Sequence, residues 1–249
     1  MEAFKEYAKV YDALNYEKDY AAEAKEIMDL VQQYSHERDI LMVGCGTGKH
    51  DRELTQYGYR IHGIDLSEEM IKTAKKNSGE LPITYETADI RHYDSHTQYP
   101  IVLSLFHVIS YLNSNEDLLA AFETIGKQLS TGGIFIFDAW YGVGVIHDLP
   151  SVRVKRVNTS ESEIMRIAEP KLHLEKNVVD VNYDIVITNK TTCVQKRIKE
   201  THSMRYLFTP EIETYLKMNG LCLLQCIDCK TKKSPTLDTW TAYFVAIKQ

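Results

Sequence analysis

Short apolar runs alternate with amphipathic stretches over the first 140 residues of the chain. The amphipathic stretches repeat apolar positions at helical spacing, and each apolar run has the length of a strand. The expected strands are 40–43, 61–64, 83–86, 101–105 and 134–137, and the expected helices are 19–34, 49–57, one capped by Ser67 and one that starts at Ser114. This alternation predicts a parallel sheet with helices on both faces.

The hydrophobic period changes from helical spacing to two after about Gly144. Within 152–208 apolar and polar residues alternate, which predicts three or four antiparallel strands with one covered face. A helix then begins at Thr209-Pro210 and ends before Gly220. The last strands, at 221–227 and 240–247, would complete the main sheet as an antiparallel hairpin. We therefore expect an antiparallel insert of roughly 60 residues before the last helix.

Composition and charge exclude several classes of protein. The chain has 249 residues, 44% of them apolar, and a net charge of −6, so nucleic acid is not expected as a partner. No apolar run reaches the roughly 18 residues that would span a membrane, and residues 1–20 are charged without the apolar core of a signal peptide. Five cysteines suggest reduced thiols and hence the cytoplasm.

A glycine turn follows the first expected strand of the sheet and carries the main functional signal. It is Gly44-Cys45-Gly46-Thr47-Gly48, and a helix follows it, as in a nucleotide-binding unit. A dinucleotide fingerprint would need glycine where Lys49 stands. Asp65 ends the next strand, 19 positions after Gly46, where its carboxylate can accept two hydrogen bonds from a ribose diol. The set predicts a site for S-adenosylmethionine (SAM).

Ligands of such sheets bind at the carboxyl ends of the strands, and this rule locates further candidates. Asp89 could accept from the adenine amino group while the Ile90 amide donates to a ring nitrogen, although Asp89 could instead cap a turn. Leu66 and Met70 could sandwich the adenine, although Met70 could equally pack in its helix. The residues expected to bind SAM from these motifs are Gly44, Cys45, Gly46, Gly48, Asp65, Leu66, Met70, Asp89, Ile90 and Leu105.

The candidates for catalysis follow the fourth strand, where the donor methyl and the acceptor would meet. His107 could act as general base for a hydroxyl acceptor, or it could be a buried histidine bonded to a backbone carbonyl. Tyr111 is a rival for the same role. The acceptor side is expected to include Phe106, Trp140, Tyr141 and Trp240. Methyl transfer from a sulfonium depends mainly on alignment, so no metal is expected.

Three cysteines near the end of the chain offer a competing interpretation. Cys222, Cys226 and Cys229 have the spacing of the iron–sulfur motif of radical SAM enzymes. They lie in an expected strand, however, in which Cys222 and Cys226 would share one face and Cys229 would take the other.

The motifs together resemble the class I SAM-dependent methyltransferases, and within them the branch of bacterial nucleotide-linked amino-sugar N,N-dimethyltransferases. The resemblance covers nearly the whole chain, and it implies a doubly wound, seven-stranded Rossmann-like α/β sheet with an antiparallel insert. It also implies that Tyr11 and Tyr20 contact SAM beneath a closing N-terminal segment. It rests on Val10-Tyr11-Asp12, Lys18-Asp19-Tyr20, the glycine turn, Gly63 to Ser67, Ala88 to Arg91 and Thr131-Gly132-Gly133.

The resemblance is weaker on the acceptor side of the site. The family carries a histidine where this chain has Tyr111, and an arginine for the nucleotide phosphates where this chain reads Leu237 to Trp240. We expect N-methylation of a nucleotide-linked amino sugar or glycan precursor, with O-methylation by His107 or SAM binding without catalysis as alternatives. The expected segments are a cap (1–36), a SAM-binding core (37–145), an insert that lines the acceptor pocket or makes a homodimer contact (146–208) and a closing segment (209–249).

Overall fold

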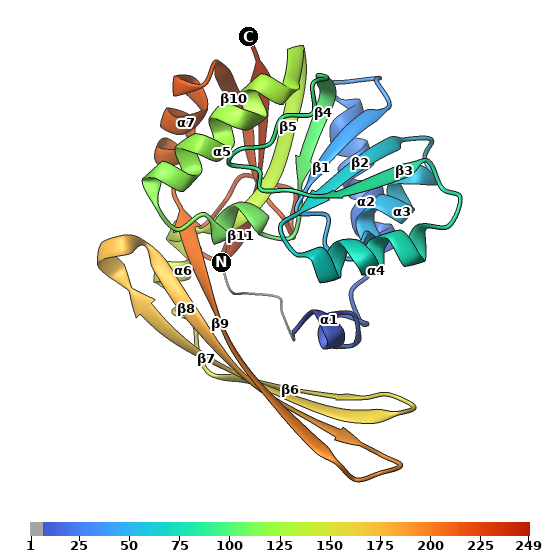
Figure 1. Cartoon of the computed structure of the whole chain (residues 1–249). Helices are drawn as coiled ribbons and strands as arrows, with labels where there is room; N and C mark the ends of the chain where they lie inside the picture. Colours follow the sequence, from blue (N-terminus) through green and yellow to red (C-terminus); the bar gives the residue numbers. More distant parts are fainter. Residues whose placement is uncertain (1–6) are drawn as a thin grey trace.

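Seven strands pair side by side to form the central sheet of the computed structural model, which describes residues 7–249 (Figure 1). The first five strands are parallel, and the last two add an antiparallel hairpin at one edge. Across the sheet the order is β3 (Ile83–Thr87), β2 (Arg60–Asp65), β1 (Asp39–Val43), β4 (Tyr99–Ser104), β5 (Leu129–Tyr141), β11 (Thr241–Lys248) and β10 (Leu221–Asp228). The doubly wound sheet expected from the alternating pattern is confirmed.

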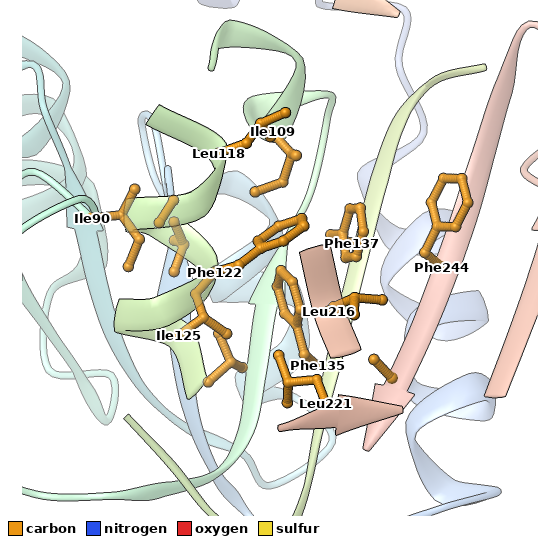
Figure 2. Close-up of a cluster of buried hydrophobic side chains, with 14 of the residues drawn as sticks. Ile90, Ile109, Leu118, Phe122, Ile125, Phe135, Phe137, Leu216, Leu221 and Phe244 are labelled. Carbon is orange, nitrogen blue, oxygen red and sulfur yellow. The ribbon is translucent and has the colours of Figure 1, made fainter. Parts of the chain in front are cut away.

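Helices cover both faces of this sheet. On one face pack α2 (Tyr20–Gln32), α3 (Lys49–Thr55) and α4 (Glu68–Ser78), and on the other pack α5 (Asn115–Gln128) and α7 (Thr209–Met218). Figure 2 shows the second face, where Phe122 of α5 and Leu216 of α7 pack over Phe135, Phe137 and Phe244 of the sheet. All five side chains are fully buried. This core fixes the strands whose ends carry the site.

Side-chain caps start the helices where the sequence predicts them. Asp19 accepts from the Ala22 amide, and Ser67 and Ser114 cap α4 and α5 in the same way. At Ser114 this cap has no return hydrogen bond from the third residue of the helix, because the Asp117 carboxylate accepts from Arg91 instead.

Four antiparallel strands project away from the sheet, and we call residues 153–207 the arm (Figure 1). The arm is joined to the sheet where the end of β9 pairs with the end of β5, through Trp140–Tyr206 and Tyr141–Leu207. Its strands are β6 (Arg153–Asn158), β7 (Ser162–His173), β8 (Val178–Asn189) and β9 (Gln195–Leu207), with the short turn η2 (Leu174–Lys176) between β7 and β8.

Three details differ from the sequence-based expectations. Helices α1 (Ala8–Leu14) and α6 (Gly142–His147) were not expected, and α1 buries Tyr7 and Val10 against the arm. Strand β5 begins five residues before the expected Ile134, since Leu129 pairs with Tyr99. Val154, which the alternating pattern groups with the apolar positions of the arm, is 48% exposed because it lies on the opposite face of β6 from the buried Val157.

Between residues 7 and 249, the structure has no helix of the length and apolarity needed to cross a membrane. The division of the chain into four segments stays a prediction, and residues 1–6 of its first segment lie outside the described residues.

Candidate functional site

A cavity of about 500 Å³ opens at the carboxyl ends of the parallel strands. The core contributes the glycine turn, the ends of β2 and β3, and the segment from Leu105 to Leu112, which includes the short helix η1 (Val108–Tyr111). The N-terminal segment closes one side of the cavity with Tyr7, Tyr11 and Tyr20, and the arm closes another with Arg166, Tyr183, His202 and Met204. The site predicted from the sequence and the arm therefore share one cavity.

The three glycines of the turn all have left-handed backbone angles, but the space around them differs. At Gly44 a Cβ would lie 2.4 Å from Val108, and at Gly48 it would lie 2.1 Å from the Tyr85 hydroxyl. At Gly46, φ is +57° and nothing lies within 4 Å of where a Cβ would be. A side chain at Gly44 or Gly48 would collide with Val108 or Tyr85, whereas at Gly46 only the left-handed backbone angle favours glycine.

Asp65 is anchored to the turn by backbone hydrogen bonds. Its carboxylate accepts from the Gly46 amide at 2.9 Å and from the Ser67 amide at 2.8 Å. Burial raises the pKa of Asp65, and these two donors act against that rise. The carboxylate is therefore held in place at the cavity wall, as recognition of a diol requires.

The cavity offers further groups that suit SAM. The Tyr20 hydroxyl is buried and accepts or donates no hydrogen bond among the described residues. Since a buried hydroxyl without a partner costs about 1–3 kcal/mol, it fits a ligand that supplies one. Leu66, Met70 and Ile90 give the wall beside Asp65 its apolar surface. An orphaned hydroxyl, a fixed carboxylate and apolar neighbours match an adenosine-bearing ligand.

Asp89 lies on the cavity wall but is engaged by a neighbouring arginine. Its Oδ2 accepts from Arg91 Nη2 at 2.6 Å, and its Oδ1 accepts from the Arg91 amide at 3.0 Å. The Arg91 guanidinium lowers the pKa of the Asp89 carboxyl. Asp89 thus closes a turn, as one interpretation had it, and it also lines the cavity. Its contact with the adenine amino group stays a prediction.

His107 lies against a carboxylate, and between residues 7 and 249 no backbone carbonyl accepts a hydrogen bond from its ring. Its Nδ1 lies 2.5 Å from Oδ2 of Asp138, which is buried at the end of β5. The His107 amide also donates to both Asp138 oxygens, at 3.1 and 3.2 Å. The ring lines the cavity next to Phe106. A histidine held by a buried carboxylate is arranged as a general base.

Tyr111 meets a histidine that the sequence analysis did not single out. Its hydroxyl lies 2.8 Å from Nδ1 of His202, on β9 of the arm. Trp140 joins these two residues on the cavity wall, together with Arg166 and Tyr183. The sequence did not reveal these arm residues, because an alternating pattern predicts strands without showing which side chains reach a cavity. The available clue was that Arg166 and His202 fall at positions of the pattern otherwise taken by apolar residues.

Three sequence-predicted residues lie away from the cavity. Gly48 packs on Tyr85 beneath the turn. Tyr141 packs in the core beside α5 and α7. Trp240 stands edge-on to Trp140, with ring centroids 5.5 Å apart, so it supports the wall from behind. The other predicted residues line the cavity; they are Tyr11, Tyr20, Gly44, Cys45, Gly46, Asp65, Leu66, Met70, Asp89, Ile90, Leu105, Phe106, His107, Tyr111 and Trp140.

The three C-terminal cysteines do not converge on one point. Cys226 packs with the core cluster under α5 and α7, whereas Cys229 packs with the cluster on the opposite face of the sheet. Thiols on opposite faces cannot hold one cluster, so the iron–sulfur alternative is set aside.

Part of this chain is similar in sequence to known methyltransferases. Residues 40–133 match the sequence family described as "Methyltransferase domain". The chain is 34% identical, over 139 residues, to the dTDP-3-amino-3,4,6-trideoxy-alpha-D-glucopyranose N,N-dimethyltransferase of Streptomyces venezuelae. That match covers 55% of this chain and 58% of the relative. The chain thus spans less than two thirds of that relative's length.

Solved structures match over the whole length of the chain. A SAM-dependent methyltransferase from Clostridium acetobutylicum superposes with a TM-score of 0.83 at 21% identity, covering 98% of both chains. The sugar N-methyltransferase KedS8 from Streptoalloteichus gives a TM-score of 0.84 at 20% identity, covering 100% of this chain and 95% of the other. At these identities the likeness concerns the fold, arm included.

Proposed function

Because this chain belongs to the class I SAM-dependent methyltransferases, we propose that it methylates the amino group of a nucleotide-linked amino sugar or related glycan precursor. When bound, SAM supplies a methyl group on a sulfonium: the amine lone pair forms the new N–C bond, the C–S bond breaks, and S-adenosylhomocysteine is left. The chain itself must hold the two reactants in line and exclude water.

On the cofactor side, the proposed contacts are those of the glycine turn and its neighbours. Asp65 would take the ribose hydroxyls, since the Gly46 and Ser67 amides fix its orientation. Leu66 and Met70 would pack against the adenine. Tyr11 and Tyr20 would close the cavity from the N-terminal side, where both line it.

The observation that carries the choice of acceptor is the charge of Arg166 on the arm's side of the cavity. Its guanidinium lies over the Tyr183 ring, 5.1 Å from the centroid, and its Nη1 donates to the Tyr7 hydroxyl at 3.4 Å. Among residues 7–249 it has no carboxylate partner, and its Nε is buried without an acceptor. A guanidinium so placed favours an anionic group on the acceptor, such as a nucleotide phosphate.

His107 and Asp138 favour a second candidate, O-methylation of a sugar or metabolite hydroxyl. A hydroxyl needs a general base more than a neutral amine does. The 2.5 Å approach of the His107 ring to a buried carboxylate supplies one at the cavity wall.

The deciding experiment offers purified protein and SAM two dTDP-linked sugars that differ only in bearing an amino or a hydroxyl group. Mass spectrometry then counts the methyls transferred. One or two methyls on the amino sugar alone support the proposal, and methylation of the hydroxy sugar alone overturns it in favour of the second candidate.

We further propose that the enzyme works in the cytoplasm, in keeping with its five unpaired cysteines.

A further inference from the structure

Three side chains form a chain of polar contacts that ends at the cavity. The Tyr111 hydroxyl lies 2.8 Å from His202 Nδ1, and His202 Nε2 lies 3.3 Å from Oε2 of Glu200. Glu200 and His202 are two residues apart on β9 and so share one face of the arm. His202 is 2% exposed, and both it and Tyr111 line the cavity. A buried histidine is thus held at both ring nitrogens.

The contact with the carboxylate sets the direction of these hydrogen bonds. An ionised carboxylate can only accept, so His202 Nε2 must carry the proton that faces Glu200. In a neutral imidazole the other nitrogen is then an acceptor, and Nδ1 receives the Tyr111 hydroxyl proton. The Tyr111 oxygen therefore presents itself to the cavity as an acceptor. An N–H group of a bound molecule is its natural complement.

We propose that Tyr111, His202 and Glu200 are a proton relay that deprotonates the acceptor's ammonium group before methyl transfer. The relay rests on the proposed function, in that the acceptor is an amine. One N–H bond of the ammonium breaks, and its proton goes to the Tyr111 oxygen. The Tyr111 hydroxyl proton moves at the same time to His202 Nδ1. His202 becomes an imidazolium that Glu200 stabilises, and the nitrogen lone pair is free to attack.

The groups around His202 keep the relay ready to receive a proton. The Tyr7 and Tyr183 rings meet its imidazole edge-on at 5.1 and 4.9 Å, and Arg166 is the nearby cation. Burial lowers the pKa of His202, Glu200 opposes that effect, and Arg166 adds to it. The lowered pKa favours the neutral ring, whose Nδ1 can accept a proton from Tyr111. Burial also raises the pKa of Tyr111 well above its usual value, so it starts as a phenol.

The first test measures kcat against pH for Tyr111→Phe and His202→Gln with a dTDP-linked amino sugar. A variant without the relay can methylate only the acceptor molecules whose amine is already neutral in solution. For an amine with a pKa near 8, the neutral fraction rises with pH. We expect a loss of roughly thirtyfold at pH 6.5, where about one amine in thirty is neutral, and a loss below fivefold at pH 9.5. Equal losses at both pH values, or a loss under threefold at pH 6.5, would overturn the relay.

Matched controls separate this effect from a folding defect. His173 also pairs with a carboxylate on the arm, Asp180 at 2.8 Å, but it is not part of the cavity wall. His173→Gln should leave kcat unchanged at both pH values. Tyr111→Phe should keep the SAM dissociation constant within about twofold, as judged by calorimetry.

A second test does not depend on turnover. In ¹⁵N-labelled protein with S-adenosylhomocysteine, the His202 signals are those that vanish in His202→Gln. A proton on Nε2 and a bare Nδ1 support the relay, and a proton on Nδ1 overturns it. If the wild type methylates no amine, the proposed function fails, yet this spectrum still tests the relay's hydrogen bonds.

Discussion

Nδ1 of His107 lies 2.5 Å from Oδ2 of Asp138, although the two residues are 31 positions apart in the sequence. They meet because β4 and β5 are parallel neighbours whose carboxyl ends lie at the same edge of the sheet. Phe106 and His107 both adopt left-handed backbone angles there, with φ of +67° and +65°. The two His107 amide contacts to Asp138 help to hold this unusual conformation.

This pair makes the two candidate reactions separable by one substitution. His107→Gln should lower turnover of a hydroxyl acceptor by roughly two to four orders of magnitude, because the general base is lost. Turnover of an amine acceptor should fall less than tenfold, since Tyr111 takes its proton. Steady-state kinetics with both acceptors measures the difference. His36→Gln, at an exposed histidine, is the control; equal losses with both acceptors would contradict the division of roles.

Loss of the Asp65 carboxylate should weaken the binding of SAM. Asp65→Ala removes the partner of the ribose hydroxyls and the anchor of the Gly46 amide, and we expect a loss of about 1–3 kcal/mol in binding free energy. Isothermal titration calorimetry provides the measurement. Asp29→Ala, at an exposed position of α2, should bind SAM normally. Unchanged affinity in Asp65→Ala would mean that the ribose is held elsewhere.

Neutralising Arg166 should weaken the binding of the acceptor and leave the binding of SAM unchanged. Arg166→Gln should raise KM for a dTDP-linked amino sugar by about tenfold to a hundredfold, the usual effect of losing a hydrogen bond to a charged group. KM for SAM should not change. Arg156→Gln removes the same charge from an exposed position of the arm and should leave both constants alone. If the two variants behave alike, the guanidinium does not contact the acceptor.

Asp51, buried beneath the glycine turn, should make stability depend on pH. Burial raises the pKa of its carboxyl to about 7, against an unfolded value near 3.8. The folded state therefore binds this proton more tightly, and the resulting stability is present at pH 4 and lost as pH rises to 7. At pH 8 the ionised carboxylate costs up to about 4 kcal/mol.

Asp51→Asn should relieve this cost. Its melting temperature should exceed that of the wild type at pH 8, and the gap should close as pH approaches 4. Thermal unfolding followed by circular dichroism at both pH values gives the comparison. A gap that is the same at pH 4 and pH 8 would place the carboxyl's pKa outside this window.

The sequence predicted the core more fully than the arm, for a physical reason. Apolar runs such as 101–105 are buried on both faces by helices, so burial and pattern agree. The turn at 44–48 was recognisable because glycine adopts its left-handed backbone angles without strain. In the arm, alternation predicted strands but gave no register, and register decides which side chains reach the cavity.

Long-range pairs were the part of the site that the sequence could not supply. His107 was a candidate, but nothing local points to Asp138. Tyr111 was a candidate too, yet its partner His202 lies 91 positions away. Such contacts arise from the packing of the arm on η1. The same packing explains α1, a helix of seven residues whose Val10 and Leu14 are buried against the arm.

The junction of β9 with β5 spans only two residue pairs, Trp140–Tyr206 and Tyr141–Leu207. Beyond these two pairs the arm meets the core through side chains, as where Arg205 donates to Asn115 at 2.7 Å, and no further pair of described residues extends the core sheet's hydrogen-bond ladder into it. Substitutions in the arm would therefore change which acceptor binds, while the glycine turn and Asp65, which are proposed to bind SAM, lie outside it. A chimaera cut at this junction would exchange the arm's side of the cavity together with Glu200 and His202 of the relay, and it would keep the glycine turn and Asp65 of the core.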